Sequence, residues 1–230
     1  METDNTYNEG MYADEKIAHE WIAWIESIVD DVRDKEIYPY LSTWIKKQKP
    51  RLILEIGSGQ GACSEKIDLG ETKYIGVEPS AYLRARAAIL YPSRDFLPGK
   101  AEALPLESES IDAAFSVFVW FHIPDLALAA RELARVLKPG GAFAIVTANP
   151  EMYGLWKSWH KNTRLEGKEL RGDMNKLSGD IMFLHTMDEL KQSLLDENLV
   201  IASILDCGYE DENKVGSGFS IIISGNKAVS

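Results

Sequence analysis

The sequence lacks the features that would place the protein in a membrane, in a disulfide-rich class or among metal proteins. It has two cysteines, Cys63 and Cys207, too few and too far apart for a disulfide framework or a zinc cluster. No apolar run approaches the ~20 residues needed to cross a bilayer. The first ten residues are acidic and polar, unlike a secretory signal. We therefore expect a cytoplasmic protein with no metal site.

Basic residues are also scarce relative to acidic ones. The chain has 25 Lys and Arg against 36 Asp and Glu, a formal net charge of −11. Such a surface repels polyanions, so we expect neither nucleic acid nor an anionic membrane as a partner. A small molecule fits better. A length of 230 residues favours one domain with one principal site, as a monomer or a homodimer.

The chain changes character after Pro50. Before it, apolar residues at helical spacing predict a helix over 14–32 and a second one over 38–48, so residues 1–50 form a helical cap. After it, short apolar runs alternate with helical stretches, which is typical of a parallel sheet in an α/β protein. The core over 51–148 has predicted strands at 52–56, 73–77, 93–97, 111–119 and 142–147.

The rhythm stops at 149–182, a polar segment with scattered glycines and no clear periodicity. A segment of that length inside a domain is usually a lid, a binding insertion or poorly ordered, so we expect a possible acceptor site there. Regularity returns over 183–230. A helix at 187–197 and strands at 200–207 and 218–224 are expected to complete the same sheet.

A glycine-rich turn follows the first predicted strand and precedes a helix expected over 60–67. Gly57, Gly59 and Gly61 permit positive φ and let a ligand lie against bare backbone. The pattern is ambiguous, because Gly57, Gly59 and Ala62 also satisfy a dinucleotide fingerprint. Glu78 lies near the position of a ribose-binding acid, ~20 residues on. An NAD-type oxidoreductase is therefore an alternative at this point.

Charge around this turn helps to separate the two cofactors. Glu55, Glu78 and Glu102 each fall near the carboxyl end of one of the first three strands, where the ligand crevice of an open α/β sheet lies. A pyrophosphate prefers unpaired amides and cations. S-adenosylmethionine carries an ammonium, a sulfonium and no phosphate. The acidic rim therefore favours S-adenosylmethionine.

Four segments together resemble the class I S-adenosylmethionine-dependent methyltransferases, in particular their small-molecule, methyltransferase type 11-like branch. They stand in the family's order and spacing, at 54–62, 76–79, 101–106 followed by Ile111 and Asp112, and 133–141. The resemblance implies a Rossmann-like, doubly wound α/β fold whose mostly parallel seven-stranded sheet has an antiparallel last strand. It also implies methyl transfer from S-adenosylmethionine to a small-molecule acceptor.

The resemblance assigns cofactor contacts residue by residue. The methionine part would be held by Glu55 and the turn, the ribose by Glu78, the adenine by the next loop, and the sulfonium would lie over the end of the fourth strand. A stretch before the first helix would close over the cofactor. The residues so implied are Glu55, Gly57, Ser58, Gly59, Gly61, Glu78, Pro79, Ala101, Glu102, Val117, Phe118 and Tyr12. Lys100 departs from the pattern: the family often has an aspartate there, and lysine cannot accept the adenine amino hydrogens.

Methyl transfer can proceed by alignment and desolvation without a protein nucleophile. A base is needed only if the acceptor must lose a proton. His122, at the end of the fourth strand, is either that base or a packing residue. We expect Asp112 to be structural. A protein that binds S-adenosylmethionine without catalysis is the remaining alternative.

Overall fold

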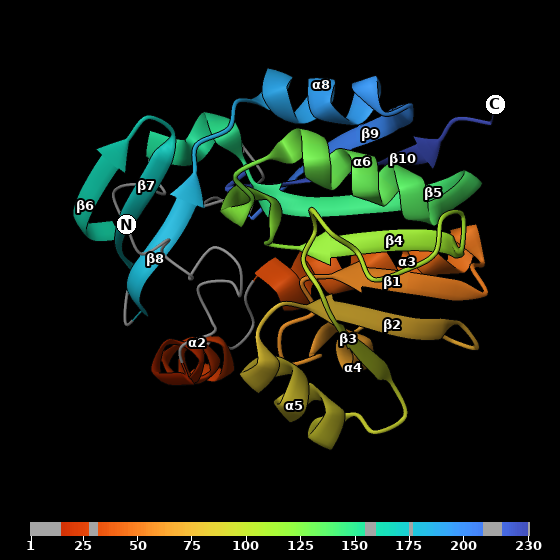
Figure 1. Ribbon diagram of the computed structural model, residues 1–230, viewed down its shortest axis with the longest axis horizontal. Helices are drawn as coiled ribbons and strands as arrows, with labels where there is room; N and C mark the ends of the chain where they lie inside the picture. Colours follow the sequence, from red (N-terminus) through yellow and green to blue (C-terminus); the bar gives the residue numbers. More distant parts are fainter. Residues whose placement is uncertain (1–14, 28–31, 155–159, 175–176, 209–217, 230) are drawn as a thin grey trace.

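The computed structural model describes residues 15–27, 32–154, 160–174, 177–208 and 218–229. Seven strands form one sheet in the order β3-β2-β1-β4-β5-β10-β9 (Figure 1). β10 runs antiparallel to both its neighbours, and the pairs among the first five strands are parallel. This confirms the predicted fold class. The bounds are β1 (Leu52–Ile56), β2 (Lys73–Glu78), β3 (Asp95–Pro98), β4 (Ile111–Val117), β5 (Leu137–Ala148), β9 (Leu199–Cys207) and β10 (Ser220–Lys227).

The central strands are buried on both faces, which is why they read as continuous apolar runs. On one face, α6 (Leu126–Val136) and α8 (Met187–Asp196) cover the sheet and contribute Leu133 and Leu194 to the core. On the other face, α3 (Tyr38–Gln48) packs Trp44 near Tyr74 of β2 and Phe115 of β4. α5 (Ala81–Leu90) lies by β2 and β3. Helices on both faces make the sheet doubly wound.

Several boundaries differ from the expected ones; β5, for example, begins at Leu137 rather than at residue 142, and two of the differences have a backbone reason. The helix after the glycine turn is only α4 (Cys63–Lys66), because Gly59 and Gly61 have φ of +53° and +82°. β4 ends two residues early because Phe118 has φ +58°. The first helix is described as α2 (Glu15–Ser27), because residues 14 and 28–31 lie outside the described part of the chain, and the π-helical turn η2 (Arg33–Ile37) leads directly into α3.

The segment at 149–182 is more regular than expected. It contains a three-stranded antiparallel sheet of β6 (His160–Glu166), β7 (Glu169–Met174) and β8 (Leu177–Phe183). A two-residue turn joins β6 to β7, and its first residue, Gly167, has φ +58°, as a tight hairpin requires. The prediction of an aperiodic segment was wrong because these strands carry mostly polar side chains. Figure 1 places this small sheet beyond one end of the large one, beside α2.

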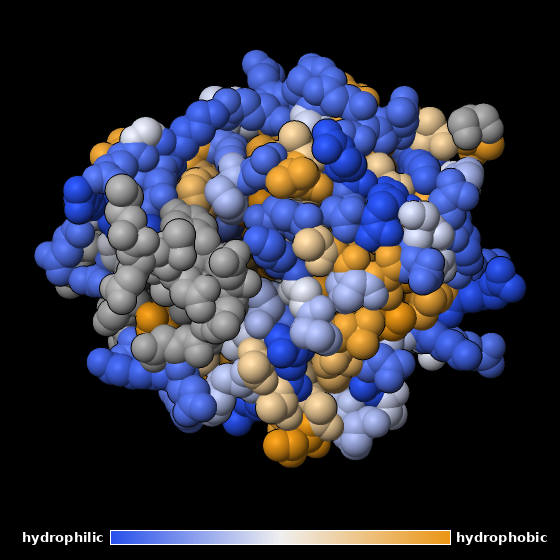
Figure 2. Space-filling model, in the orientation of Figure 1, coloured by the Kyte–Doolittle hydropathy of each residue, from blue (hydrophilic) through white to orange (hydrophobic). Residues whose placement is uncertain are grey.

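An apolar cavity of about 440 Å³ opens at the amino-terminal ends of β1 and β4, the opposite edge from the glycine turn. Figure 2 shows hydrophobic side chains gathered over this part of the surface. The lining is Leu52, Leu104, Pro105, Leu106, Glu107, Ser110 and Ile111. Among the helices that the structure describes, none combines the length and the hydropathy of a membrane span.

Candidate cofactor site

The glycine turn between β1 and α4 is held against the end of β2. The amides of Gly57 and Ser58 both donate to the carbonyl of Val77, at 2.8 and 3.1 Å. Gly57, Gly59 and Gly61 all have positive φ, between +53° and +82°. The turn therefore needs glycine for its backbone conformation alone.

Close packing adds a second requirement for glycine. A Cβ on Gly57 would lie 2.4 Å from Cγ2 of Val119, and one on Gly59 would lie 3.0 Å from Cη2 of Trp21. The sequence assigned no site role to Val119, and it placed Trp21 only on the core face of its helix. Helical spacing finds an apolar face but does not say which part of the fold covers it.

Glu78 lies beside the turn, as the sequence predicted. Its Oε2 accepts a hydrogen bond from the amide of Gly59 at 3.0 Å, and its Oε1 accepts one from the amide of Ser80 at 2.9 Å. The side chain is buried, and burial raises its pKa although both amides favour the charged form. A carboxylate has about four acceptor sites, so acceptor capacity for ribose hydroxyls remains.

Glu55 ends up in a fully enclosed polar cluster on the same face of the sheet. The Tyr74 hydroxyl donates to its Oε2, and the Cys63 thiol also hydrogen-bonds to it. Burial raises the pKa of Glu55 to about 8, against the effect of these donors. Burial therefore favours the protonated form of Glu55 in the isolated protein. The acidic rim inferred from the sequence carries less negative charge than a count of its carboxyl groups suggests.

The end of β4 is brought next to the turn. Ser116 pairs with Ile56 of β1, and two residues later Phe118 adopts φ +58° while its amide donates to the carbonyl of Val146 at 2.8 Å. The Arg33 guanidinium lies 5.3 Å from the centre of the Phe118 ring. A non-glycine residue in this conformation is strained by about 1–3 kcal/mol, a cost often found at functional sites. Val117 and Phe118 are half-buried.

His122 lies in the 3-10 turn η3 (Trp120–His122), directly after β4. Its Nδ1 is 2.6 Å from the carbonyl oxygen of Ile181 in β8, the geometry of a donated hydrogen bond. A neutral imidazole that donates from Nδ1 has Nε2 as its proton acceptor. His185 makes the reciprocal contact, from Nε2 to the carbonyl of Ile123 at 2.7 Å. Two histidines thus tie the small sheet to the end of β4.

Two of the residues that the resemblance assigns to the adenine, Ala101 and Glu102, lie in the turn after β3. The Ala103 amide donates to the Lys100 carbonyl at 3.0 Å, which folds residues 100–103 into a tight turn. Ala101 is buried in the core, whereas Glu102 and, after β2, Pro79 are half-buried. Tyr12 lies outside the described residues.

Asp112 has a structural role, as its position at the start of β4 suggested. Its Oδ2 accepts from the amides of Arg51 and Leu52 at 3.0 and 2.9 Å, and its Oδ1 pairs with Nζ of Lys138 at 2.5 Å. It anchors the beginning of β1, far from the glycine turn.

Comparison with known proteins agrees with this geometry. Residues 54–145 match the family described as "Methyltransferase domain". An uncharacterized methyltransferase of Mycobacterium tuberculosis is 31% identical over 108 residues, which are 47% of this chain and 44% of that protein. An uncharacterized methyltransferase of Schizosaccharomyces pombe is 28% identical over 80% of this chain and 72% of its own length.

Among solved structures, an S-adenosylmethionine-dependent methyltransferase from Clostridium acetobutylicum superposes with a TM-score of 0.69 at 14% identity, covering 94% of this chain and 99% of that one. At that identity the likeness concerns the fold. Residues 54–145 are therefore similar to a methyltransferase domain, and the whole chain shares its fold with solved S-adenosylmethionine-dependent methyltransferases. It spans less than half the length of the mycobacterial relative.

Proposed function

We propose that this protein transfers the methyl group of S-adenosylmethionine to a small-molecule acceptor. The observation that carries the proposal is the pair of buried carboxyl groups, Glu55 and Glu78, at the positive-φ glycine turn of a methyltransferase sheet. Buried acids suit the ammonium, the ribose hydroxyls and the sulfonium of this cofactor. They suit the phosphates of a dinucleotide poorly, and the comparisons give that alternative no support.

The residues of the site fit the parts of the cofactor in chain order. Glu55 and the backbone from Gly57 to Gly61 would hold the methionine part, and Glu78 the ribose. Pro79 and the turn at 100–103 would hold the adenine. An ammonium beside Glu55 would favour its charged form, so cofactor binding is expected to release a proton at neutral pH.

The acceptor is proposed to bind between the end of β4 and the small sheet. β8 contacts α2 and η3, so this sheet lies beside the segment that carries Phe118 and His122. Three of its cations form ion pairs: Arg164 with Glu166, Lys168 with Glu189 and Arg171 with Glu169. An anionic acceptor therefore has less support than a neutral or amine one.

S-adenosylmethionine supplies an activated methyl group for in-line displacement. The protein's share is to align the acceptor with that methyl group and to exclude water, which can account for most of the rate. His122 is proposed to take the acceptor's proton on Nε2 where the acceptor has one to lose. Its Nδ1 contact with Ile181 would fix the tautomer that makes this possible.

Calorimetry with S-adenosylhomocysteine and with NAD tests the cofactor. We expect binding of the first and none of the second, and an affinity at least about tenfold lower in Glu78→Ala because the ribose contact is lost. NAD binding without S-adenosylhomocysteine binding would overturn the proposal. A screen of acceptors with labelled cofactor distinguishes an enzyme from a protein that only binds the cofactor.

A further inference from the structure

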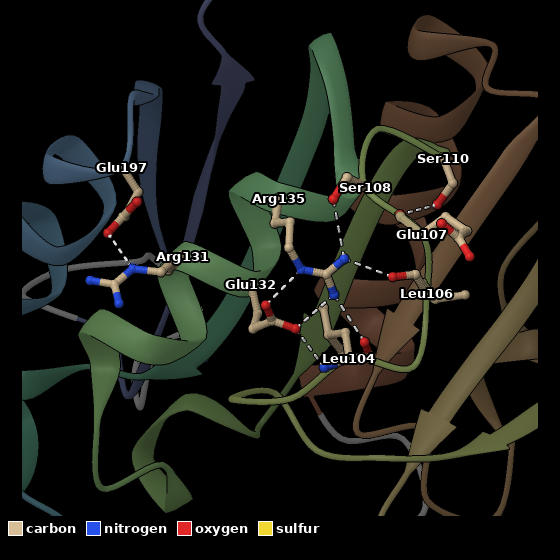
Figure 3. A network of polar contacts seen from close by, with 9 residues as sticks. All are labelled: Leu104, Leu106, Glu107, Ser108, Ser110, Arg131, Glu132, Arg135 and Glu197. Atoms are coloured by element: carbon tan, nitrogen blue, oxygen red, sulfur yellow. Dashed lines mark hydrogen bonds and ion pairs between the residues drawn. The ribbon is translucent and has the colours of Figure 1, made fainter.

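The loop between β3 and β4 is fastened to the last turn of α6 by one pair of side chains, Glu132 and Arg135 (Figure 3). The Leu104 amide donates to Oε2 of Glu132 at 2.8 Å, and Nη2 of Arg135 donates to the Leu104 carbonyl at 3.0 Å. Nη1 of Arg135 donates to the Leu106 carbonyl at 2.7 Å. Both backbone polar groups of Leu104 are thus held by the pair.

The pair is itself rigid. Arg135 donates to Glu132 from Nε at 2.7 Å and from Nη2 at 2.8 Å, a two-point contact between a planar guanidinium and a carboxylate. Hydrogen bonding to Arg135 lowers the pKa of Glu132, so the pair stays charged at neutral pH. A backbone hydrogen bond also joins the loop to α6, since the Glu109 amide donates to the Arg135 carbonyl at 2.8 Å.

This clamp adjoins the turn at 100–103. Leu104 follows that turn directly and is buried beside Ala101 in the core. Pro105 closes the other side, because a Cβ on Gly99 would lie 2.7 Å from its Cδ. The backbone of residues 101–103 is therefore fixed between Gly99, which packs against Pro105, and Leu104, which the clamp holds.

We propose that Glu132 and Arg135 are positioning residues for cofactor recognition: they fix the backbone of residues 101–103 in the conformation that reads the adenine edge. This rests on the proposed function. Lys100 replaces the acid often found before Ala101 in the family this chain resembles, so backbone groups of this turn are left to make the adenine contact. Backbone groups discriminate between bases only when their positions are fixed.

The same helix offers a matched control one turn earlier. Arg131 also pairs with a glutamate, Glu197, at 3.2 Å, but it points away from the loop toward the end of α8 (Figure 3). Arg131→Ala removes the same charge and the same number of side-chain atoms from α6 as Arg135→Ala. It leaves every contact of Leu104 in place.

The test compares S-adenosylhomocysteine with S-inosylhomocysteine, in which an oxygen replaces the adenine amino group, by calorimetry. The unaltered protein is expected to prefer the adenine form about tenfold or more. Arg135→Ala should weaken the adenine form about tenfold and reduce the preference to within about threefold. Arg131→Ala should preserve both values. Arg135→Lys, which cannot make the two-point contact, should fall between them.

An equal loss for both ligands in Arg135→Ala would mean general destabilisation and would overturn the inference, as would equal affinity of the unaltered protein for the two. If Arg135→Ala does not fold, Glu132→Gln breaks the ion pair at constant size and must show the same reduced preference. Absence of S-adenosylhomocysteine binding by the unaltered protein would instead remove the proposed function, and with it this inference. Hydrogen exchange at residues 101–106 reports on the clamp without ligand: Arg135→Ala should exchange faster there, and Arg131→Ala should not.

Discussion

The glycine turn and the small sheet are neighbours, yet different contacts hold them. Around the turn, the polar groups of Glu55 and Glu78 are buried and hydrogen-bonded, and side chains pack directly on glycine backbone. The small sheet rests on a few apolar side chains, among them Leu170 and Met182, and on its histidine ties. Its ion pairs lie at the surface, where each contributes about 0–1 kcal/mol.

This difference separates two kinds of constraint. The turn has no space for an added atom, because several neighbouring side chains pack closely against its glycine backbone and its buried acids. The small sheet can exchange most of its surface side chains at little cost in stability. One region therefore tolerates few substitutions and the other tolerates many. Four substitutions test this contrast.

The largest effect is expected at Gly57. An alanine there has φ +72° and a Cβ only 2.4 Å from Val119. We expect Gly57→Ala to lower affinity for S-adenosylhomocysteine at least about a hundredfold and the free energy of unfolding by about 3 kcal/mol. Gly70→Ala is the control, because its φ is +54° but no atom lies within 4 Å. It should lose about 1 kcal/mol of stability and no affinity.

His122→Ala should affect turnover without affecting cofactor binding at the glycine turn. If His122 is the base, turnover falls about a hundredfold while calorimetric affinity for S-adenosylhomocysteine stays unchanged. His185→Ala is the matched control, since it breaks the reciprocal tie to the Ile123 carbonyl. A similar loss of turnover in both variants would assign His122 to docking rather than to proton transfer.

Glu55 makes the turn sensitive to pH. Because its pKa is raised from 4.5 to about 8, the folded protein keeps a proton that the unfolded chain has lost in that interval. The stability it contributes is complete below pH 4.5 and is lost as pH rises through 8, by up to about 1.4 kcal/mol per pH unit. Urea denaturation between pH 5.5 and 8.5 should show this slope, and Glu55→Gln should flatten it.

Glu189→Gln is the control for that experiment. Its hydrogen bond with Lys168 lowers the pKa of Glu189 to about 2, so its contribution is lost only as pH falls below about 4.5. The slope between pH 5.5 and 8.5 should persist in this variant. A slope equally steep in Glu55→Gln would contradict the buried, protonated state of Glu55. Glu78, with its pKa also raised, leaves a residual slope of the same sign.

The smallest effect concerns His185. Burial lowers its pKa below 6.5, so the stability it contributes is present above pH 6.5 and is lost as pH falls below that value. This opposes the effect of Glu55. When pH falls from 7.5 to 5.5, His185→Gln should therefore gain more stability than the unaltered protein. An identical gain in urea denaturation would count against a buried neutral imidazole.

The sequence predicted most of the large sheet because its strands are buried on both faces and its turns contain glycine. Both signals are local, so they can be read from the sequence without knowing which segments pair in the fold. It missed the small sheet, whose strands carry polar side chains and acquire their pattern only by pairing with one another. The sequence also assigned no role to Glu132 and Arg135. Their spacing of three residues on a predicted helix does not indicate which loop packs against that helix.

The sequence by itself determined the fold class, the place of the glycine turn and the resemblance to methyltransferase domains, because spacing and residue type along the chain suffice for these. Tertiary structure decided that Glu55 is buried and that its pKa is raised, that Trp21 and Val119 pack against the turn, and that Arg135 donates a hydrogen bond to the Leu104 carbonyl. Each of these depends on atoms distant in sequence. Burial and hydrogen-bond distance exist only once the chain has folded.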